Sequence, residues 1–456
     1  MPVAAQVLRH ASIRPDRPAV RGPGGELSYA GFARRVRGVA ARLSGRGAGR
    51  GTLVAISLAD PVDLLTVVLA ADLAGATPLL CDPSWDARVR EAIPADLRVD
   101  VMPPIADGPQ TWPDPLPGDR AWACFGSGST GRPRAVVRTR ASWTASFQRV
   151  SELAGIGSDD VVLVPGPLTS SLYGFAAVHA LAAGATVLVP GRWSPGTLAA
   201  QLRGATVAHL VPHYLPAVLD ALREGAESSL RTVVIGGAAL PAGLHERAAD
   251  AGVRVMSYYG ATELSFVAVD TDGSGLRPFP GVRIEVRTPP GESLGEVWVR
   301  SPWLSEGYLA DAVGPLRVDG DGWMSVGDVA EPYRPGEALR LRGRGDGAIQ
   351  TGGATVVPED VEEVLRSVPG VGDIVVVGSP HPDLGAVVTA ILEVGAGAPP
   401  PRATLEAVAR GGLDAAQRPR RWYAVESLPR TPAGKPARGL VAARLAGGDH
   451  DLRRLN

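Results

Sequence analysis

The strongest local pattern in this sequence is Ala121-Trp-Ala-Cys-Phe-Gly-Ser-Gly-Ser-Thr-Gly-Arg-Pro-Arg134. Residues 121–125 predict a buried strand, and the glycines that follow allow backbone N–H groups to turn toward an anion. The serine and threonine hydroxyls add further donors, so the loop is predicted to bind phosphate. It lacks the Gly-Lys-Ser/Thr of a Walker loop and the glycine spacing of a dinucleotide fingerprint. A flexible Gly/Ser loop is the alternative interpretation.

The chain before this loop alternates between helices and strands. Residues 28–46 predict an amphipathic helix that Ser28 caps, residues 54–58 a buried strand, residues 61–74 a second helix and residues 77–80 a second strand. This alternation is typical of a parallel α/β sheet. Between residues 93 and 117, proline is frequent and periodicity is lost, which predicts a surface connection without regular structure.

Length and composition describe a globular protein of more than one domain. The chain has 456 residues, of which 45% are hydrophobic and 20% charged, and two or three domains are expected at this length. Its net charge of −1 gives no reason to expect nucleic acid or an anionic membrane as a partner. Cys81 and Cys124 form no metal-binding or disulfide pattern, and no signal peptide or membrane span is evident. We therefore expect a cytoplasmic protein.

The chain contains a single lysine, Lys435, among its 46 lysine and arginine residues. It lies in Leu428-Pro-Arg-Thr-Pro-Ala-Gly-Lys-Pro-Ala-Arg438, a polar turn near the C-terminus. Arginine presents a planar fork, whereas lysine presents a compact point charge on a thin stem. A site that places one cation between a carboxylate and a phosphate needs the compact point charge of lysine. The alternative is an exposed lysine without function.

From residue 340 the sequence pattern changes. Residues 374–377 and 386–394 predict strands and residues 404–410 a helix, which together indicate a small α+β unit. Three glycines around Asp346 (residues 343, 345 and 347) permit the large backbone rotation that a hinge requires. We therefore predict a large domain of residues 1–343 and a small domain of residues 344–456.

The glycine-rich loop resembles the phosphate loop of the adenylate-forming superfamily, which includes acyl-CoA synthetases, peptide-synthetase adenylation domains and luciferases. That loop reads Ser-Gly-Ser/Thr-Thr-Gly-x-Pro-Lys-Gly, and residues 127–135 match it except at Arg134 and Ala135. Further blocks match the family in its order: Ile235–Leu240, Tyr258–Glu263, Asp321–Asp328, Gly343–Glu362 and Pro429–Arg438. The resemblance covers about residues 125–438, whereas the N-terminal part agrees only in its α/β pattern.

The resemblance implies both a fold and a reaction. The fold would be α/β, with a large N-terminal domain of stacked α/β subdomains and a small, mobile α+β C-terminal domain. The enzyme would be an AMP-forming ligase that uses ATP and Mg²⁺ to convert a carboxylic acid into an acyl-adenylate. It would then pass the acyl group to a thiol, with coenzyme A as the first choice. Alternatives are a stand-alone enzyme that loads the phosphopantetheine of a carrier protein, an amide-forming synthetase, and a nucleotide-binding homologue that has lost catalysis.

Each block contains residue types that suit this chemistry. Both reactants are anions, so the site must neutralise charge while it holds them in line. The resemblance assigns Lys435 to bridge carboxylate and phosphate, Glu263 to bind Mg²⁺, Thr262 to donate to the α-phosphate and Asp328 to accept from the ribose hydroxyls. Taken alone, Glu263 could instead be a carboxylate at a helix N-terminus, and Asp328 a turn residue.

The remaining residues that the resemblance assigns fall into three groups. The ATP- and AMP-binding group contains Ser127, Gly128, Ser129, Thr130, Gly131, Arg134, Gly237, Ala238, Tyr259, Gly260, Asp328 and Arg344. Tyr259 would offer a ring face to adenine, unless it is a core residue. The small domain would rotate about Asp346, and the loop at Gly352 and Gly353 would then face the thiol.

The acyl pocket is assigned to Ser171, Tyr173, His213 and Gly236. Ser171 stands where many acyl-CoA synthetases have histidine, and the block lacks the aspartate that binds an α-ammonium group in amino-acid adenylation domains. We therefore expect a small carboxylic acid without an α-amine, either an aryl acid or one with a short to medium acyl chain. Arg134 and Gln350 replace frequent lysines. Zinc binding by His209 and His213 is disfavoured because Pro212 lies between them.

Overall fold

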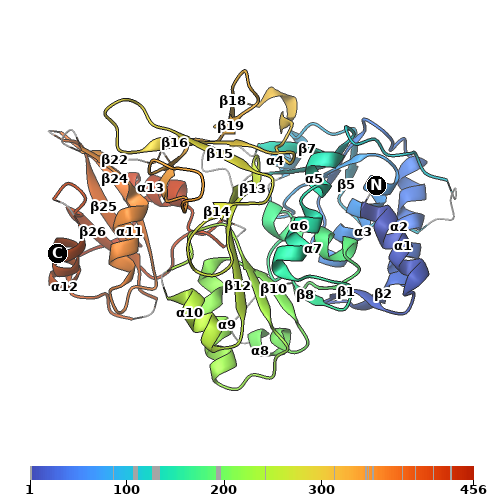
Figure 1. Cartoon of the computed structure of the whole chain (residues 1–456), viewed down its shortest axis with the longest axis horizontal. Coiled ribbons are helices and arrows are strands. Elements are labelled where there is room, and N and C mark those ends of the chain that lie inside the picture. The colour runs from blue at the N-terminus through green and yellow to red at the C-terminus, as the bar shows by residue number, and fades with distance from the viewer. Residues whose placement is uncertain are drawn as a thin grey trace.

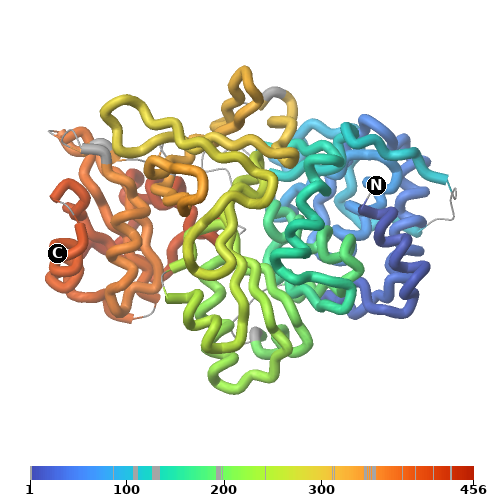
Figure 2. Tube along the Cα trace, in the orientation of Figure 1, coloured from blue at the N-terminus to red at the C-terminus, as the bar shows by residue number. Residues whose placement is uncertain are grey.

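The computed structural model describes residues 3–85, 87–105, 111–125, 134–191, 197–241, 243–312, 314–344, 347, 349–351, 354–382, 384–395, 397–413, 415–431 and 434–455. These residues form four sheets with helices packed around them (Figure 1). The N-terminal elements lie at one end of the elongated molecule and the C-terminal elements at the other, as the trace in Figure 2 shows. The predicted fold is confirmed, because a large N-terminal α/β region is followed by a smaller C-terminal domain built on its own sheet.

The first sheet has nine strands in the order β14-β13-β12-β11-β10-β8-β9-β1-β2. Its central strands, from β1 through β9, β8, β10 and β11 to β12, pair in parallel. The strands are β1 (Pro18–Gly22), β2 (Gly25–Ser28), β8 (Val161–Leu163), β9 (Thr186–Leu188), β10 (Val207–Leu210), β11 (Thr232–Ile235), β12 (Arg254–Ala261), β13 (Ser265–Asp270) and β14 (Arg277–Pro278).

The second sheet has the order β17-β7-β6-β4-β3-β5 and contains the strand before the glycine-rich loop. Its strands are β3 (Leu53–Ile56), β4 (Thr77–Leu80), β5 (Leu97–Val99), β6 (Arg120–Phe125), β7 (Ala135–Thr139) and β17 (Gly307–Tyr308). Strands β5, β3, β4 and β6 are parallel, and the pairing of β3 with β4 confirms the predicted parallel α/β pattern, whereas β7 and β17 are antiparallel. Strand β5 corrects one expectation, since it lies inside the predicted irregular connection. Three residues are too few to show a period, and only the pairing with β3 defines this strand.

Two further sheets complete the architecture. The third contains β15 (Arg283–Arg287), β16 (Gly295–Arg300), β18 (Arg317–Val318), β19 (Met324–Ser325), β20 (Asp328–Ala330) and β21 (Leu341–Arg344). The fourth contains β22 (Ile349–Thr351), β23 (Ala354–Val356), β24 (Asp373–His381), β25 (Gly385–Glu393), β26 (Arg421–Val425) and β27 (Arg453–Arg454). The chain passes from the third sheet to the fourth between β21 and β22. The division at residues 343 and 344 stays a prediction.

Two helices near the N-terminus, α2 and α3, each begin with a side-chain cap. Ser28 accepts a hydrogen bond from Gly31 N and so caps α2, as predicted, and Asp60 caps α3. The helices before the third sheet are α1 (Val3–Ile13), α2 (Tyr29–Ser44), α3 (Pro61–Leu73), α4 (Ala87–Glu91), α5 (Arg140–Thr144), α6 (Phe147–Ala154), α7 (Ser171–Ala182), α8 (Leu198–Leu202), η2 (Pro212–Tyr214), α9 (Leu215–Arg223) and α10 (Leu244–Asp250). The remaining helices are η3 (Leu309–Asp311), α11 (Pro358–Arg366), α12 (Arg402–Gly412) and α13 (Arg438–Ala446).

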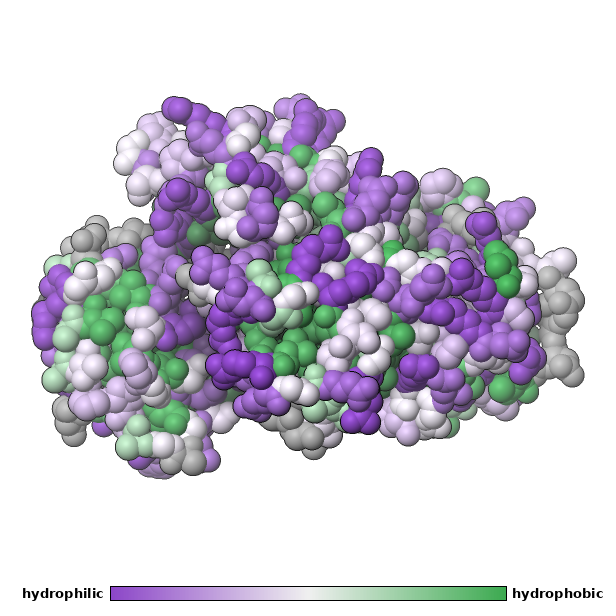
Figure 3. All heavy atoms as spheres, turned by 60° about the horizontal axis from the view of Figure 1, so that its bottom comes forward, coloured by the Kyte–Doolittle hydropathy of each residue, from purple (hydrophilic) through white to green (hydrophobic). Residues whose placement is uncertain are grey.

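The surface shows no single large apolar area on the face drawn in Figure 3. Hydrophilic side chains cover most of this face, and apolar side chains gather in separate areas. Among the described residues, no helix has both the length and the apolar character that crossing a membrane requires.

A buried ion pair joins three helices of the large domain. Arg140 on α5 donates to Asp72 on α3, and the two side chains are 3% and 6% exposed. Asp72 also accepts from the backbone N–H of Ala4 on α1 at 3.0 Å. If one charge of such a buried pair is removed, the other stays buried without a partner or water, which destabilises the fold.

We therefore expect Asp72→Ala to lower the free energy of unfolding by about 3–5 kcal/mol, because it leaves the Arg140 charge buried and unpaired. Chemical denaturation followed by circular dichroism measures this change. Asp63→Ala on the same helix is the matched control, since its pair with Arg35 is partly exposed and should cost about 1 kcal/mol or less. Equal losses for the two variants would contradict the prediction.

Candidate functional site

Strand β12 carries Tyr259 near its end, and the turn between β12 and β13 carries Thr262 and Glu263. The two strands form a tight hairpin with an irregularity between Tyr259 and Gly260. A Cβ atom at Gly260 would lie 2.1 Å from the carbonyl oxygen of Ser265, so only glycine fits there. Ser265 itself has a φ of 60°, a left-handed conformation that is rare outside glycine. The local backbone thus fixes the directions in which the side chains of this turn point.

Tyr259 and Asp328 meet across two sheets. The Tyr259 hydroxyl on β12 donates to Asp328 Oδ2 on β20 at 2.6 Å. Gly327, directly before Asp328, has a left-handed φ of 82°. The residues predicted to contact adenine and ribose are therefore adjacent, although 69 positions separate them in sequence.

Glu263 is buried and held by a residue that the sequence analysis did not identify. The hydroxyl of Tyr308 on β17 donates to Glu263 Oε1 at 2.8 Å. Burial and the nearby Glu263 carboxylate raise the pKa of Tyr308, so its hydroxyl stays protonated and continues to donate. Strand β17 pairs with β7, which directly follows the glycine-rich loop, and the guanidinium of Arg134 lies 5.9 Å from the Tyr308 ring centroid. Tyr308 thus connects Glu263 with the strand after that loop.

Arg138 on β7 is a second residue that the sequence did not indicate. It is buried and donates to the carbonyl oxygens of Thr262 at 2.9 Å and Trp303 at 2.6 Å. Burial lowers the pKa of its guanidinium to about 10, so it remains charged at neutral pH. A charged residue inside the apolar strand Ala135–Thr139 was the available signal. Arg138 therefore fixes the backbone next to Glu263.

Thr262 is also tied to the start of helix α7. Its hydroxyl lies 3.0 Å from the hydroxyl of Ser171, the first residue of that helix. The residue predicted to contact the α-phosphate and a residue predicted for the acyl pocket therefore share one hydrogen bond. This contact links the two sides of the predicted reaction.

Lys435 reaches the large domain. A Cβ atom at Gly237 would lie 2.7 Å from Lys435 Cε and 3.4 Å from Nζ, so the lysine side chain lies directly against this glycine. Gly237 follows β11 and has a φ of 97°. Beside it, a Cβ atom at Gly434 would lie 3.5 Å from both Val211 and the Tyr214 hydroxyl. The lone lysine of the small domain is therefore placed at the end of β11.

Two of the residues predicted for the acyl pocket, His213 and Gly236, come shortly after β10 and β11, whereas Ser171 and Tyr173 lie at the start of α7. Tyr173 is fully buried, and among the described residues its hydroxyl has no hydrogen-bond partner. A Cβ atom at Gly236 would lie 2.5 Å from the Tyr258 hydroxyl. His213 lies on η2, and partial burial of its imidazole, together with the charge of Arg430, lowers its pKa, which favours the neutral form.

His209, in contrast, is enclosed in β10. Burial lowers the pKa of its imidazole to about 3. Among the described residues, no group of three or more histidine, cysteine, aspartate or glutamate side chains has an arrangement that could hold a metal ion.

Several predicted site residues lie outside the described residues: Ser127, Gly128, Ser129, Thr130, Gly131, Asp346, Gly352 and Gly353. Their assigned roles stay predictions. The backbone of Arg344 is described, and it pairs with Asp328 between β21 and β20. The third sheet therefore brings together Asp328 and Arg344, two residues that are both predicted to bind ATP or AMP.

Comparison with known proteins identifies the family. The model of the AMP-binding enzyme family matches residues 7–104 and 96–309, and that of the AMP-binding enzyme C-terminal domain matches residues 360–435. An uncharacterised acyl-CoA ligase, YhfT of Bacillus subtilis, is 31% identical over 94% of this chain and 96% of its own length. A feruloyl-CoA synthase from Amycolatopsis is 29% identical over 96% of this chain and 98% of its own.

A solved structure is similar over the same extent. The amide bond synthetase McbA of Marinactinospora thermotolerans superposes with a TM-score of 0.78 at 28% identity, covering 97% of this chain and all of its own. The family matches cover both the large and the small domain, including the position of Lys435. The chain therefore belongs to the AMP-binding enzyme family, the adenylate-forming superfamily that its sequence motifs predicted.

Proposed function

We propose that this protein is an AMP-forming ligase that activates a carboxylic acid with ATP and transfers the acyl group to coenzyme A. The observation that carries the proposal is the position of Lys435 against Gly237, the residue next to Gly236 of the predicted acyl pocket. One mobile cation close to the predicted carboxylate and phosphate positions is what the adenylation step needs. The names of the acyl-CoA ligase relatives support coenzyme A as the acceptor.

The first step joins the substrate carboxylate to the α-phosphate of ATP and releases pyrophosphate. Lys435 offsets the repulsion between the two anions, and Thr262 donates to the α-phosphate through its hydroxyl. Tyr259 holds the adenine, and Asp328 accepts from the ribose hydroxyls. Together these residues hold the reacting atoms in line, and this alignment lowers the activation free energy of the step.

The residues around Glu263 fit a magnesium ion. Magnesium prefers oxygen ligands and usually takes one or two carboxylates. Tyr308 donates to one carboxylate oxygen, Oε1, and so orients the carboxylate group of Glu263. Mg²⁺ bound there would neutralise phosphate charge, while Arg138 holds the backbone of the turn in place.

The second step requires the small domain to move. We propose that residues 344–456 rotate about Asp346, withdraw Lys435 and bring Gly352 and Gly353 toward the thiol. The pattern of glycines around Asp346 supports this proposal. The thiolate then attacks the acyl carbon, the bond between the acyl carbon and the phosphate oxygen breaks, and AMP leaves. Lys435 is therefore needed only in the first step.

The acid is proposed to be aromatic. The residues assigned to its pocket include Tyr173, and the Tyr258 hydroxyl lies beside Gly236. Such side chains suit a flat ring that carries polar groups. The feruloyl-CoA synthase name supports this class. ATP–pyrophosphate exchange across a panel of aryl and short aliphatic acids tests it, and exchange with aliphatic acids alone would reject it.

A prediction about the acceptor follows. With a substrate acid, ATP and Mg²⁺, acyl-CoA should form from free coenzyme A without any added protein, because coenzyme A brings its own phosphopantetheine thiol. Mass spectrometry of the products measures it. Acylation of a carrier protein alone would favour the carrier-loading alternative. Amide formation from a supplied amine without thioester would favour the activity that the name of McbA indicates.

A further inference from the structure

The loop that carries Lys435 is a short hairpin with its own hydrogen bonds. Thr431 N donates to Lys435 O at 2.7 Å, and Ala437 N donates to Pro429 O at 2.7 Å. Gly434 closes the turn with a left-handed φ of 83° and donates to Thr431 O at 2.8 Å. These bonds fix the backbone of Lys435 within the loop. They do not fix the loop to the rest of the small domain.

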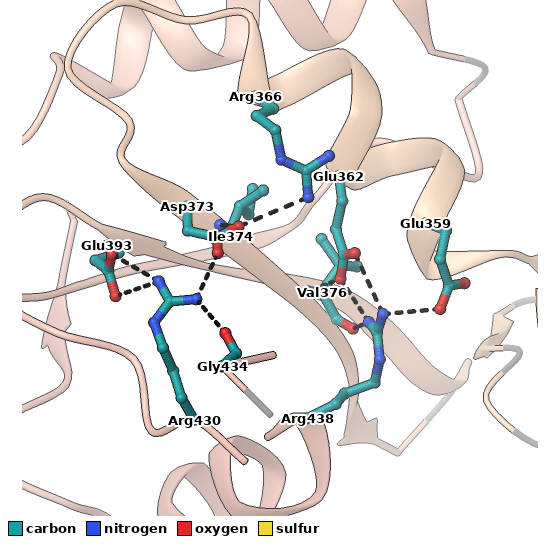
Figure 4. Close-up of polar contacts among 10 residues, drawn as sticks. All are labelled: Glu359, Glu362, Arg366, Asp373, Ile374, Val376, Glu393, Arg430, Gly434 and Arg438. Carbon is teal, nitrogen blue, oxygen red and sulfur yellow. Dashed lines mark hydrogen bonds and ion pairs between the residues drawn. The ribbon is translucent and has the colours of Figure 1, made fainter. Parts of the chain in front are cut away.

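Arg430 attaches the loop on one side. Its guanidinium donates to Asp373 Oδ2 at 3.0 Å and to both oxygens of Glu393 at 2.9 and 3.1 Å (Figure 4). It also donates to the carbonyl oxygen of Gly434, the residue before Lys435, at 3.3 Å. The Arg430 side chain is only 20% exposed, so water screens these pairs weakly. One arginine therefore joins the start of β24 and the end of β25 to the turn.

Arg438 attaches the loop on the other side. It donates to Glu362 and to the carbonyl oxygen of Val376 through Nη1, at 2.5 and 2.6 Å, and to Glu359 through Nη2 at 2.8 Å (Figure 4). Burial by itself lowers the pKa of Arg438, but the carboxylates of Glu362 and Glu359 raise it above its ordinary value. Arg438 thus binds the loop to helix α11 and strand β24.

Glu359 extends this connection to the strand that enters the small domain. A Cβ atom at Gly343 would lie 2.2 Å from Glu359 Oε2, so the carboxylate packs directly on this glycine. Gly343 belongs to β21 and has a left-handed φ of 93°. The second arginine and the predicted hinge region therefore contact the same carboxylate.

We propose that Arg430 and Arg438 are positioning residues for Lys435, a role that rests on the proposed adenylation by this site. The two arginines hold the hairpin from both ends, five residues before and three residues after the lysine. A lysine stem is long and flexible, so the Nζ position depends on where the backbone lies. A displacement of about 1 Å at a reacting group can cost about 10²-fold in rate. The paired carboxylates keep that displacement small.

The experiment compares Arg430→Met and Arg438→Met with wild type in separate half-reactions. The kcat of acyl-adenylate formation should fall about 10- to 100-fold, whereas KM for ATP changes less than about twofold. Thioester formation from supplied acyl-adenylate should stay near the wild-type rate. Glu393→Gln and Glu359→Gln, which keep the side-chain shape, should give smaller losses of the same kind.

A second readout does not depend on activity. Because Lys435 is the only lysine, an amine-acylating reagent modifies one side chain besides the N-terminal amine, and peptide mass spectrometry follows it. Wild-type Lys435 should be protected when ATP and Mg²⁺ are added. In the methionine variants that protection should be reduced severalfold, while thermal unfolding shows that the domain remains folded.

Arg444→Met is the matched control, because Arg444 lies on α13 as Arg438 does, but pairs with Asp449 and Asp451, which follow that helix outside the Lys435 loop. It should change neither the adenylation rate nor the protection. Adenylation within threefold of wild type in both loop variants, or equal losses in both half-reactions, would overturn the proposal. Absence of exchange activity in the wild-type enzyme on every acid tested would instead reject the proposed function. In that case the labelling experiment still tests the positioning role, and the same Lys435 protection in the methionine variants as in wild type would reject it.

Discussion

A Lys435→Ala variant should form acyl-adenylate at least about 10²- to 10³-fold more slowly than wild type, the scale of losing a main electrostatic stabiliser. The reason is the position of its amine at Gly237, where the two anionic reactants are proposed to meet. Thioester formation from supplied acyl-adenylate should be largely retained, since the charge is needed only in the first step. ATP–pyrophosphate exchange and single-turnover thioester formation measure the two steps separately.

Lys435→Arg is the sharpest control for this prediction. It keeps the charge, but a guanidinium is wider than an ammonium group and cannot fill the same space against Gly237. We expect it to fail in adenylation as the alanine variant does. Full activity of Lys435→Arg would mean that the single lysine has no special role and that the central proposal is wrong.

Glu263→Gln should lower adenylation by roughly 10²-fold. A glutamine can still accept the hydrogen bond from Tyr308 through its amide oxygen, so the change removes charge with little change in shape. If Glu263 binds Mg²⁺, the variant should also need a higher Mg²⁺ concentration for half-maximal exchange. Titration of exchange activity against Mg²⁺ measures both effects.

The matched control for this variant is Glu306→Gln. Glu306 lies two residues before Tyr308 and forms a partly exposed ion pair with Arg120, which should contribute little. Its exchange rate and Mg²⁺ dependence should stay near wild type. An unchanged Mg²⁺ dependence for Glu263→Gln, with activity within about threefold, would reject Glu263 as the metal ligand.

The sequence alone predicted those features that depend on the backbone conformation of neighbouring residues. The capping of α2 by Ser28, the parallel strands around β4 and the block Tyr258–Glu263 were all predicted from neighbouring residues. Gly260 is an example, because a Cβ atom at this position would clash with the carbonyl oxygen of Ser265, which is only a few positions away in the sequence. The family assignment follows from the same kind of local pattern, and the family comparisons confirm it.

The tertiary structure decided the contacts that join distant segments. Arg138 reaches the carbonyl of Thr262 across 124 positions, and Tyr308 reaches Glu263 across 45. No period or spacing in the sequence reveals such pairs, because they depend on which strands become neighbours. The three-residue strand β5 was missed for the same reason.

The sequence by itself thus determined the chemistry available to this protein: a glycine-rich loop, a carboxylate turn and one lysine. It could not determine which arginines hold that lysine, because the chain contains many arginines and their sequence neighbours look alike. Only the folded small domain shows that Arg430 and Arg438 reach carboxylates between 37 and 79 positions away. The physical reason is that an ion pair depends on distance and burial in space, and both are set when the sheets and helices pack together.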